Sequence, residues 1–267
     1  MQMVAASKMR KAQQAALNMR PFARLVYRFQ RRATTQSIEF NHPLLEVREV
    51  RKRAVILVGG DKGLCGALNS NIFRLASKFD PHSTLFITAG RKAAQFIART
   101  RRQLYAEFEY GDTPRFSEAK AIASCARDLF LKGEADEILI VATRFINTLT
   151  QEPVSFDFLP VGEIKGFHVP GEPTEEDLLA HATDYLFEPS PEAFLGYLLS
   201  HYLNVYIFQV LLNAKASEQS ARMVAMKNAT DNAEELIEDL TLEYNKLRQG
   251  KITTELLEIV GGQLATV

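Results

Sequence analysis

The sequence predicts a small α/β domain between two long terminal helices that pair as an antiparallel coiled coil. Three observations lead to this fold class. Short apolar runs alternate with helical stretches in the middle of the 267-residue chain, both ends carry apolar residues at heptad spacing, and residues 197–249 contain neither glycine nor proline. We expect four parts: an N-terminal helix over 1–40, an α/β domain over 50–170, a connection over 171–195 and a C-terminal helix over 196–267.

The N-terminal segment is basic and has the spacing of a helix that packs on another helix. Residues 1–38 contain eight lysines and arginines and no acidic residue. Small or apolar residues recur there in steps of four and three: Ala5, Met9, Ala12, Ala16, Met19, Ala23 and Val26. Because alanine is small, the partner helix must approach closely. Pro21 removes a helical hydrogen bond, so we expect a bend there.

The middle of the chain has the pattern of a Rossmann-like α/β domain. Apolar, β-branched runs predict buried strands over 54–58, 84–88 and 137–146, and helical stretches are expected up to Lys78, over 91–100 and over 116–131. This alternation favours a mostly parallel sheet. Residues 150–173 contain four prolines, which favours an edge strand followed by an exposed connection.

The C-terminal segment predicts one very long helix, bracketed by Gly196 and Gly250. At 1.5 Å per residue, the 53 residues from 197 to 249 would span roughly 80 Å. Its apolar stripe has near-heptad spacing: Met226, Ala229, Ala233, Leu236, Leu240, Tyr244 and Leu247. We expect residues 1–38 to pair antiparallel with part of 200–260, leaving the helix from about Asn245 onward without an intramolecular partner. The alternative for each stripe is an ordinary amphipathic helix in a bundle.

The composition excludes several classes of protein. Thirty-two basic residues balance 32 acidic residues, so the chain has no net positive charge that would indicate a nucleic-acid binder. Two cysteines cannot form a disulfide framework, and the five histidines lie too far apart for a zinc site. No apolar run is long enough to cross a membrane, and the N-terminus lacks a secretory apolar region. We therefore expect no catalytic set, no metal, no cofactor and no direct membrane insertion.

The segment from Gly59 to Gly66 follows a predicted strand and precedes a predicted helix, where a phosphate loop would lie. Its glycine spacing fits neither the P-loop nor the dinucleotide template, so we interpret it as a tight turn with positive φ. Cys65 in this turn is expected to be a core residue, with a nucleophilic role as the alternative. The acidic residues of 234–239 are expected to be a solvated helix face.

Several segments, in order along the chain, resemble the gamma subunit of rotary F-type ATP synthases. These segments are MVAASKMRKAQ (3–13), GLCGALN (63–69), RFINT (144–148), YLFEPSP (185–191), ASEQSARMVAMKNATDNAEELI (216–237), LEYNKLRQGKIT (242–253) and ITTELLEIVGG (252–262). The family usually has some twenty more residues before the MVAAS motif. The resemblance therefore implies that Met1 corresponds to an internal methionine.

The resemblance implies a central shaft inside a ring of alpha and beta subunits, where the nucleotides bind. The subunit itself would be non-catalytic, and its foot would lie on the membrane c-subunit ring with the epsilon subunit. That implies a peripheral protein on the cytoplasmic face of a bacterial inner membrane. By resemblance, the contacts with the beta subunit would involve Met1, Lys8, Arg222, Gln249, Thr253 and Glu255.

Two other interpretations of the same residues remain open. The basic arm over 8–32 could neutralise phosphates of a nucleic acid, although aromatic residues are sparse in it. The α/β domain could be a small-molecule enzyme, although it shows no nucleophile, base or phosphate loop. The sequence does not distinguish a proton from a sodium ion as the coupling ion.

Overall fold

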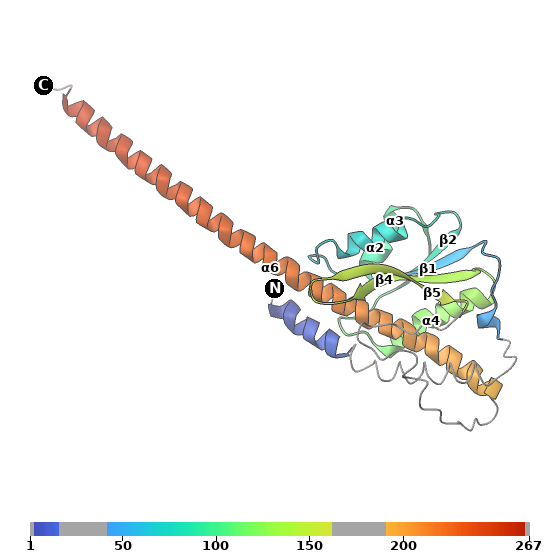
Figure 1. Cartoon of the computed structure of the whole chain (residues 1–267). Coiled ribbons are helices and arrows are strands. Elements are labelled where there is room, and N and C mark those ends of the chain that lie inside the picture. Colours follow the sequence, from blue (N-terminus) through green and yellow to red (C-terminus); the bar gives the residue numbers. More distant parts are fainter. Residues whose placement is uncertain (1–2, 16–41, 162–190, 265–267) are drawn as a thin grey trace. The chain divides into compact units, whose positions relative to one another are not determined.

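A computed structural model describes residues 3–15, 42–161 and 191–264 (Figure 1). The chain divides into two units, Met1–Val224 and Ala225–Val267, and each is described by itself. The predictions that concern Met1, the bend at Pro21, the pairing of Val26 and most of the connection over 171–195 lie outside the described residues.

The first unit contains a five-stranded sheet with the strand order β3-β2-β1-β4-β5 (Figure 1). The strands are β1 (Arg53–Val58), β2 (Thr84–Ala89), β3 (Gln103–Phe108), β4 (Glu137–Phe145) and β5 (Gln151–Leu159). The first four are mutually parallel, and β5 is antiparallel to β4. In the register of the central strands, Ala54 lies opposite Leu85 of β2 and Ile138 of β4. The mostly parallel sheet and the edge strand after residue 150 are thus confirmed.

Helices cover both faces of this sheet. Helices α2 (Leu68–Ala76) and α3 (Arg91–Arg99) contribute to the apolar core on one face, and α4 (Phe116–Leu131), the 3-10 turn η1 (Pro43–Leu45) and part of α6 contribute to the core on the other. Strand β1 supplies both cores, because Ile56 and Val58 face one side and Val55 and Leu57 face the other. A strand buried on both faces has a continuous apolar sequence, which is why β1 was predictable.

Strand β3 was not predicted from the sequence. It is an edge strand whose side chains are exposed or half-buried, so it lacks the continuous apolar run that marked the other parallel strands. Its sequence nevertheless alternates, with Leu104, Ala106 and Phe108 at every second position. That period of two is the signal that could have identified it.

Residues 3–15 are helical, and Ala5, Met9 and Ala12 are buried. These are the first three positions of the predicted apolar stripe, so its spacing is confirmed over this segment. Lys8, on the same helical segment, forms an ion pair with Asp112 at 2.6 Å. This contact holds the segment against the α/β domain.

Helix α6 (Pro191–Leu264) has 74 residues and is longer than the glycine-free run suggested. Gly196 and Gly250 lie inside it rather than at its ends. A glycine inside a helix costs about 1 kcal/mol relative to alanine, which does not break a helix of this length. No described helix is long and apolar enough to cross a bilayer.

The exposed part of α6 begins earlier than expected. Side chains from Lys227 to Glu258 are exposed, apart from the half-buried Asn245, whereas we expected exposure to begin near Asn245. Asp112 forms ion pairs with both Lys8 and Lys215, so the N-terminal segment and α6 share one carboxylate of the α/β domain.

Candidate functional site: a buried charge cluster at the carboxyl edge of the sheet

The carboxyl ends of the parallel strands form the part of the domain where a ligand would be expected. The chain passes from β1 to β2 and β3 on one side and then returns to β4 on the other side of β1. In open α/β sheets the crevice at such a change of direction is the usual ligand site. In this chain, residues 215–222 of α6 contact the loops at this edge.

Lys215 is the centre of the contact and its side chain is fully buried. Its ammonium nitrogen lies 3.0 Å from a carboxylate oxygen of Glu218, 3.5 Å from one of Asp61 and 3.7 Å from one of Asp112. It also lies 4.9 Å from the ring centroid of Tyr110. One cation is thus enclosed by groups from α6, from the loop after β1 and from the loop after β3.

Glu218 is also buried and has a second cationic partner. The guanidinium of Arg222 lies 2.6 Å from it and donates further hydrogen bonds to Gln219 and to the carbonyl oxygen of Gly63. Two residues after Glu218, the Ser220 hydroxyl donates to the carbonyl oxygen of Thr148 in the loop after β4, at 2.7 Å. Helix α6 is therefore bound to the loops that follow β1, β3 and β4.

The surroundings shift the pKa of two neighbouring groups. Burial, together with the nearby carboxylates, raises the pKa of Tyr110 far above its usual range, so its hydroxyl stays neutral and donates to the carbonyl oxygen of Gly59 at 2.9 Å. The hydrogen bond from Lys8 lowers the pKa of Asp112, with a further contribution from the charge of Lys215. Asp112 therefore remains a carboxylate that links three cations, since the ammonium of Lys62 also lies 3.7 Å from it.

Burying an ammonium costs several kcal/mol unless charged and hydrogen-bonding partners replace the lost water. The carboxylates of Glu218, Asp61 and Asp112 provide that replacement around Lys215. Removing one member of such a buried pair generally destabilises a protein by about 3–5 kcal/mol, because the remaining charge is left unpaired. The cluster therefore constrains where α6 can lie on the domain.

The glycine-rich segment after β1 is a structural turn, as predicted, with positive φ at Gly66 (58°) and also at Leu64 (62°). Gly60 leaves room for the close approach of Glu218, because a Cβ there would lie 3.2 Å from the Glu218 side chain and would require it to shift by a few tenths of an ångström. Its N–H donates to the Asn69 side chain, and the N–H of Arg91 at the start of α3 donates to Asp61. These backbone donors, which could otherwise bind a phosphate, are used within the chain.

A pocket beside the cluster is unfavourable for a phosphate on electrostatic grounds. Its charged lining consists of four carboxylates and two cations: Asp61, Glu109, Asp112, Glu118, Lys62 and Arg91. Cys65 is buried, and burial is the main cause that raises the pKa of its thiol, as expected of a core residue and not of a nucleophile. Within the described residues, no group of histidine, cysteine and acidic side chains has the arrangement of a metal site.

The residues that the sequence suggested as partner contacts lie in both units. In the first unit, Lys8 and Arg222 both belong to the ionic network, through Asp112 and Glu218. Gln249, Thr253 and Glu255 are exposed on the part of α6 in the second unit. There the Thr253 hydroxyl donates to the carbonyl oxygen of Gln249, and Glu255 lies 4.0 Å from Lys251.

The sequence analysis missed Lys215 and its three carboxylate partners. A signal was present, because Lys215 continues the buried stripe of Leu203, Ile207 and Leu211 in steps of four. A lysine that extends an apolar stripe must either reach solvent or find buried partners. Nothing local in the sequence shows that the partners are Asp61 and Asp112.

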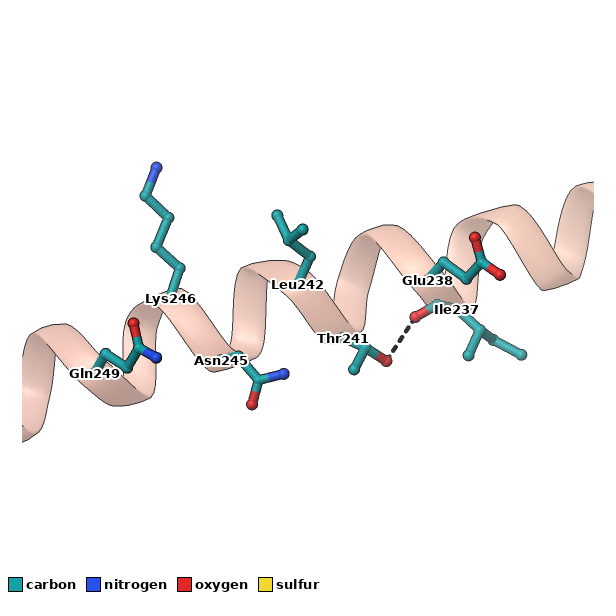
Figure 2. Close-up of a pocket in the computed structure, with 7 residues that line it drawn as sticks. All are labelled: Ile237, Glu238, Thr241, Leu242, Asn245, Lys246 and Gln249. Carbon is teal, nitrogen blue, oxygen red and sulfur yellow. Dashed lines mark hydrogen bonds between the residues drawn. The ribbon is translucent and has the colours of Figure 1, made fainter.

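The second unit presents a helix surface of mixed character. Figure 2 shows seven side chains on a stretch of α6, where the Thr241 hydroxyl donates to the carbonyl oxygen of Ile237 at 2.7 Å. All seven come from one helix, so they line a shallow surface and not an enclosed cavity. Large apolar side chains are more than half exposed along the same stretch, among them Leu236, Leu240, Leu242, Tyr244 and Leu247. An exposed apolar surface of this length is typical of a protein interface.

Comparison with known proteins gives the family. The family model described as ATP synthase matches residues 1–266. The ATP synthase gamma chain of Opitutus terrae is 43% identical over 99% of this chain and 91% of the relative, and that of Methylacidiphilum infernorum is 42% identical over 99% and 92%.

Solved structures agree with the fold. A chain from the central stalk and c-ring structure of the Tetrahymena thermophila mitochondrial ATP synthase has a TM-score of 0.62 at 23% identity, covering 86% of this chain and 97% of that chain. A chain of the Euglena gracilis mitochondrial ATP synthase has a TM-score of 0.62 at 18% identity, covering 99% and 94%. Because the family model and the relatives both span nearly its whole length, the chain belongs to the ATP synthase gamma chain family.

Proposed function

We propose that this chain is the central rotor shaft of an F-type ATP synthase, a non-catalytic subunit that couples ion flow through a membrane c ring to ATP synthesis or hydrolysis at the beta subunits. The observation that carries the proposal is the exposed helix surface from Lys227 to Glu258 in a chain of the gamma family. Such a surface needs a protein around it, and a ring of alpha and beta subunits would cover it.

Rotation acts through the asymmetry of the helix. Three identical beta subunits around one shaft meet different faces of it, for example the row of Glu238, Leu242 and Lys246 or the row of Ile237, Thr241 and Asn245 (Figure 2). The conformational energy of each beta subunit then depends on the shaft angle, and rotation shifts its affinity for nucleotides. Because such coupling is reciprocal, ATP hydrolysis drives the shaft backwards.

The partners proposed are the alpha and beta subunits, the epsilon subunit and the membrane c ring. The Tetrahymena neighbour is described as a central stalk with a c ring, which supports this arrangement. The chain would lie at the cytoplasmic face of a bacterial inner membrane and be held there by its partners. Copurification with alpha and beta subunits tests the assembly, and a chain that stays monomeric when coexpressed with them would refute the proposal.

Within the assembly, we propose that Met1, Lys8, Arg222, Gln249, Thr253 and Glu255 contact the beta subunits. The exposure of Gln249, Thr253 and Glu255 supports the part of this set that lies on the second unit. Arg222 is less available, since its side chain is 13% exposed and is bonded to Glu218. The intramolecular ion pair of Lys8 with Asp112 likewise competes with a contact to another subunit.

The contact set is tested by Glu255→Ala and Arg222→Ala in the assembled enzyme. We expect both to lower coupled ATP synthesis and ATP hydrolysis, while Glu134→Ala, an exposed acid on the α/β domain outside the proposed contact surface, serves as the control. Turnover that remains at the wild-type level in both variants would contradict the assignment of these contacts.

A further inference from the structure

We infer that Lys215 and the groups around it form a torsional clamp that fixes the rotational position of α6 on the α/β domain. The clamp consists of Lys215, Glu218, Asp61, Asp112 and Tyr110. The inference rests on the proposed shaft function, because a fixed angle matters only when the domain and the helix must turn together. Lys215 is in this sense a positioning residue.

The apolar contacts of α6 do not by themselves fix its angle. The helix contributes Leu199, Leu203, Ile207, Val210, Leu211 and Ala214 to the core that covers one face of the sheet. Apolar burial is non-directional and roughly proportional to the area removed from water, so small rotations of the helix change it little. Such a surface holds a helix against a sheet, but it selects one rotational position less sharply than paired charges do.

The clamp is directional, since its cation has three partners fixed in different places. Asp61 follows β1, Asp112 follows β3, and Glu218 lies on α6 itself. Rotating α6 by one residue position, about 100°, would move the buried ammonium away from Asp61 and Asp112. Buried ionic groups of this kind specify register, because every other register leaves them unpaired.

Asp112 extends the clamp to the N-terminal helical segment. Its carboxylate lies 2.6 Å from the ammonium of Lys8 and 3.7 Å from that of Lys215. The sheet domain, α6 and the N-terminal segment therefore meet at one carboxylate. A torque applied to the domain would pass to both helices through the Asp112 carboxylate. This carboxylate lies at the edge of the sheet where other open α/β folds bind a ligand.

The first test replaces Lys215 by methionine in the membrane-bound ATP synthase, with Lys120→Met on the exposed surface of α4 as the matched control. We expect Lys215→Met to lower the ions pumped per ATP hydrolysed by at least about twofold, because the coupling between two sites depends on the element that connects them. Amide exchange of residues 210–220 should accelerate by at least about tenfold, as for a buried ion pair that has lost one member. Lys120→Met should change neither quantity.

A covalent replacement separates torsional holding from a general loss of stability. A Cβ at position 60 would lie 3.5 Å from Cγ of Glu218, which is the place of the sulfur in a cysteine at 218. Across a disulfide the Cβ of one cysteine lies about 3 Å from the sulfur of the other, so Gly60→Cys with Glu218→Cys can bridge the loop after β1 to α6 after a shift of about half an ångström. The pair is introduced with Lys215→Met in a chain whose Cys65 and Cys125 are replaced by alanine.

We expect the enzyme with this variant chain to pump few ions per ATP hydrolysed when the disulfide is reduced. When the disulfide is oxidised, the number of ions pumped per ATP should rise again. Wild-type pumping in the reduced form, or in Lys215→Met alone, would overturn the clamp, as would an oxidised form that pumps no better than the reduced form. Should Lys215→Met not assemble, the comparison of oxidised and reduced forms still decides the question. Failure of the proposed shaft function would look different, since ATP synthesis would then persist in membranes that lack this chain altogether.

Discussion

Replacing Gly90 by alanine should destabilise the first unit strongly. Gly90 joins β2 to α3 with φ of 97°, and its N–H donates to the carbonyl oxygen of Phe108 at 2.9 Å. A Cβ at this position would lie only 2.2 Å from the carbonyl oxygen of Gly59, which also accepts the hydrogen bond of Tyr110. The substitution therefore combines an unfavourable backbone conformation with a steric clash at the carboxyl edge.

Gly133 provides the matched control for the size of the loss in stability. It too has positive φ, 72°, but a Cβ there would meet nothing within 4 Å. Gly133→Ala should thus cost only the left-handed conformation, about 1–2 kcal/mol. Gly90→Ala should cost this strain and in addition about 1–3 kcal/mol for overpacking, in total about 2–5 kcal/mol.

The assay is urea unfolding of the isolated chain, followed through amide exchange in β1 and β2. A loss for Gly90→Ala that exceeds the loss for Gly133→Ala by about 1–3 kcal/mol is expected, since only the former has a clash to relieve. Equal losses in the two variants would refute the steric reasoning, because backbone conformation alone would then account for both.

Three further outcomes follow from the structure. The isolated chain should bind no ATP at micromolar concentration, because Asn69 already accepts the N–H of Gly60 in the glycine-rich turn and Asp61 accepts the N–H of Arg91 at the start of α3; saturable binding measured by calorimetry would contradict this. Hydrogen bonds from the N–H groups of Lys52 and Arg51 lower the pKa of Asp136. The Asp136 carboxylate therefore stabilises the fold above about pH 4, and this stabilisation is lost as the pH falls through the lowered pKa. Asp136→Asn should remove this pH dependence of the unfolding curves between about pH 2 and pH 4. In the isolated chain, amide exchange should be slow over residues 199–214, which are largely buried, and fast over residues 227–258, which are exposed. Equally slow exchange over both ranges would contradict this expectation.

Much of the fold could be predicted because its signals are local. Strands β1, β2 and β4 are continuous apolar runs, and α4 was predicted with the bounds that it has in the structure. The heptad stripe at Ala5, Met9 and Ala12 identified the buried face of the first helical segment. Strand β3 was missed because an edge strand with half-exposed side chains has only a weak alternation.

The positions of charged residues were less predictable. The acidic residues of 234–239 are exposed, as the helix pattern indicated. Glu218 is also an acidic residue and lies on the same helix, yet it is buried together with Lys215. Periodicity places a residue on a face of its helix, but it does not say what covers that face.

The sequence by itself determined the order of helices and strands, the heptad spacing of the two terminal segments and the resemblance to the gamma family. These properties are local, since they depend on residues within a few turns of one another. The tertiary structure decided which carboxylate the N-terminal segment shares with α6 and which carboxylates surround Lys215. Lys215 and Asp61 are 154 positions apart in the chain, so their ion pair exists only once the sheet has brought the loop after β1 against α6. Ionic partners are selected by proximity in space within a low-dielectric interior, and a local sequence pattern contains no information about that proximity.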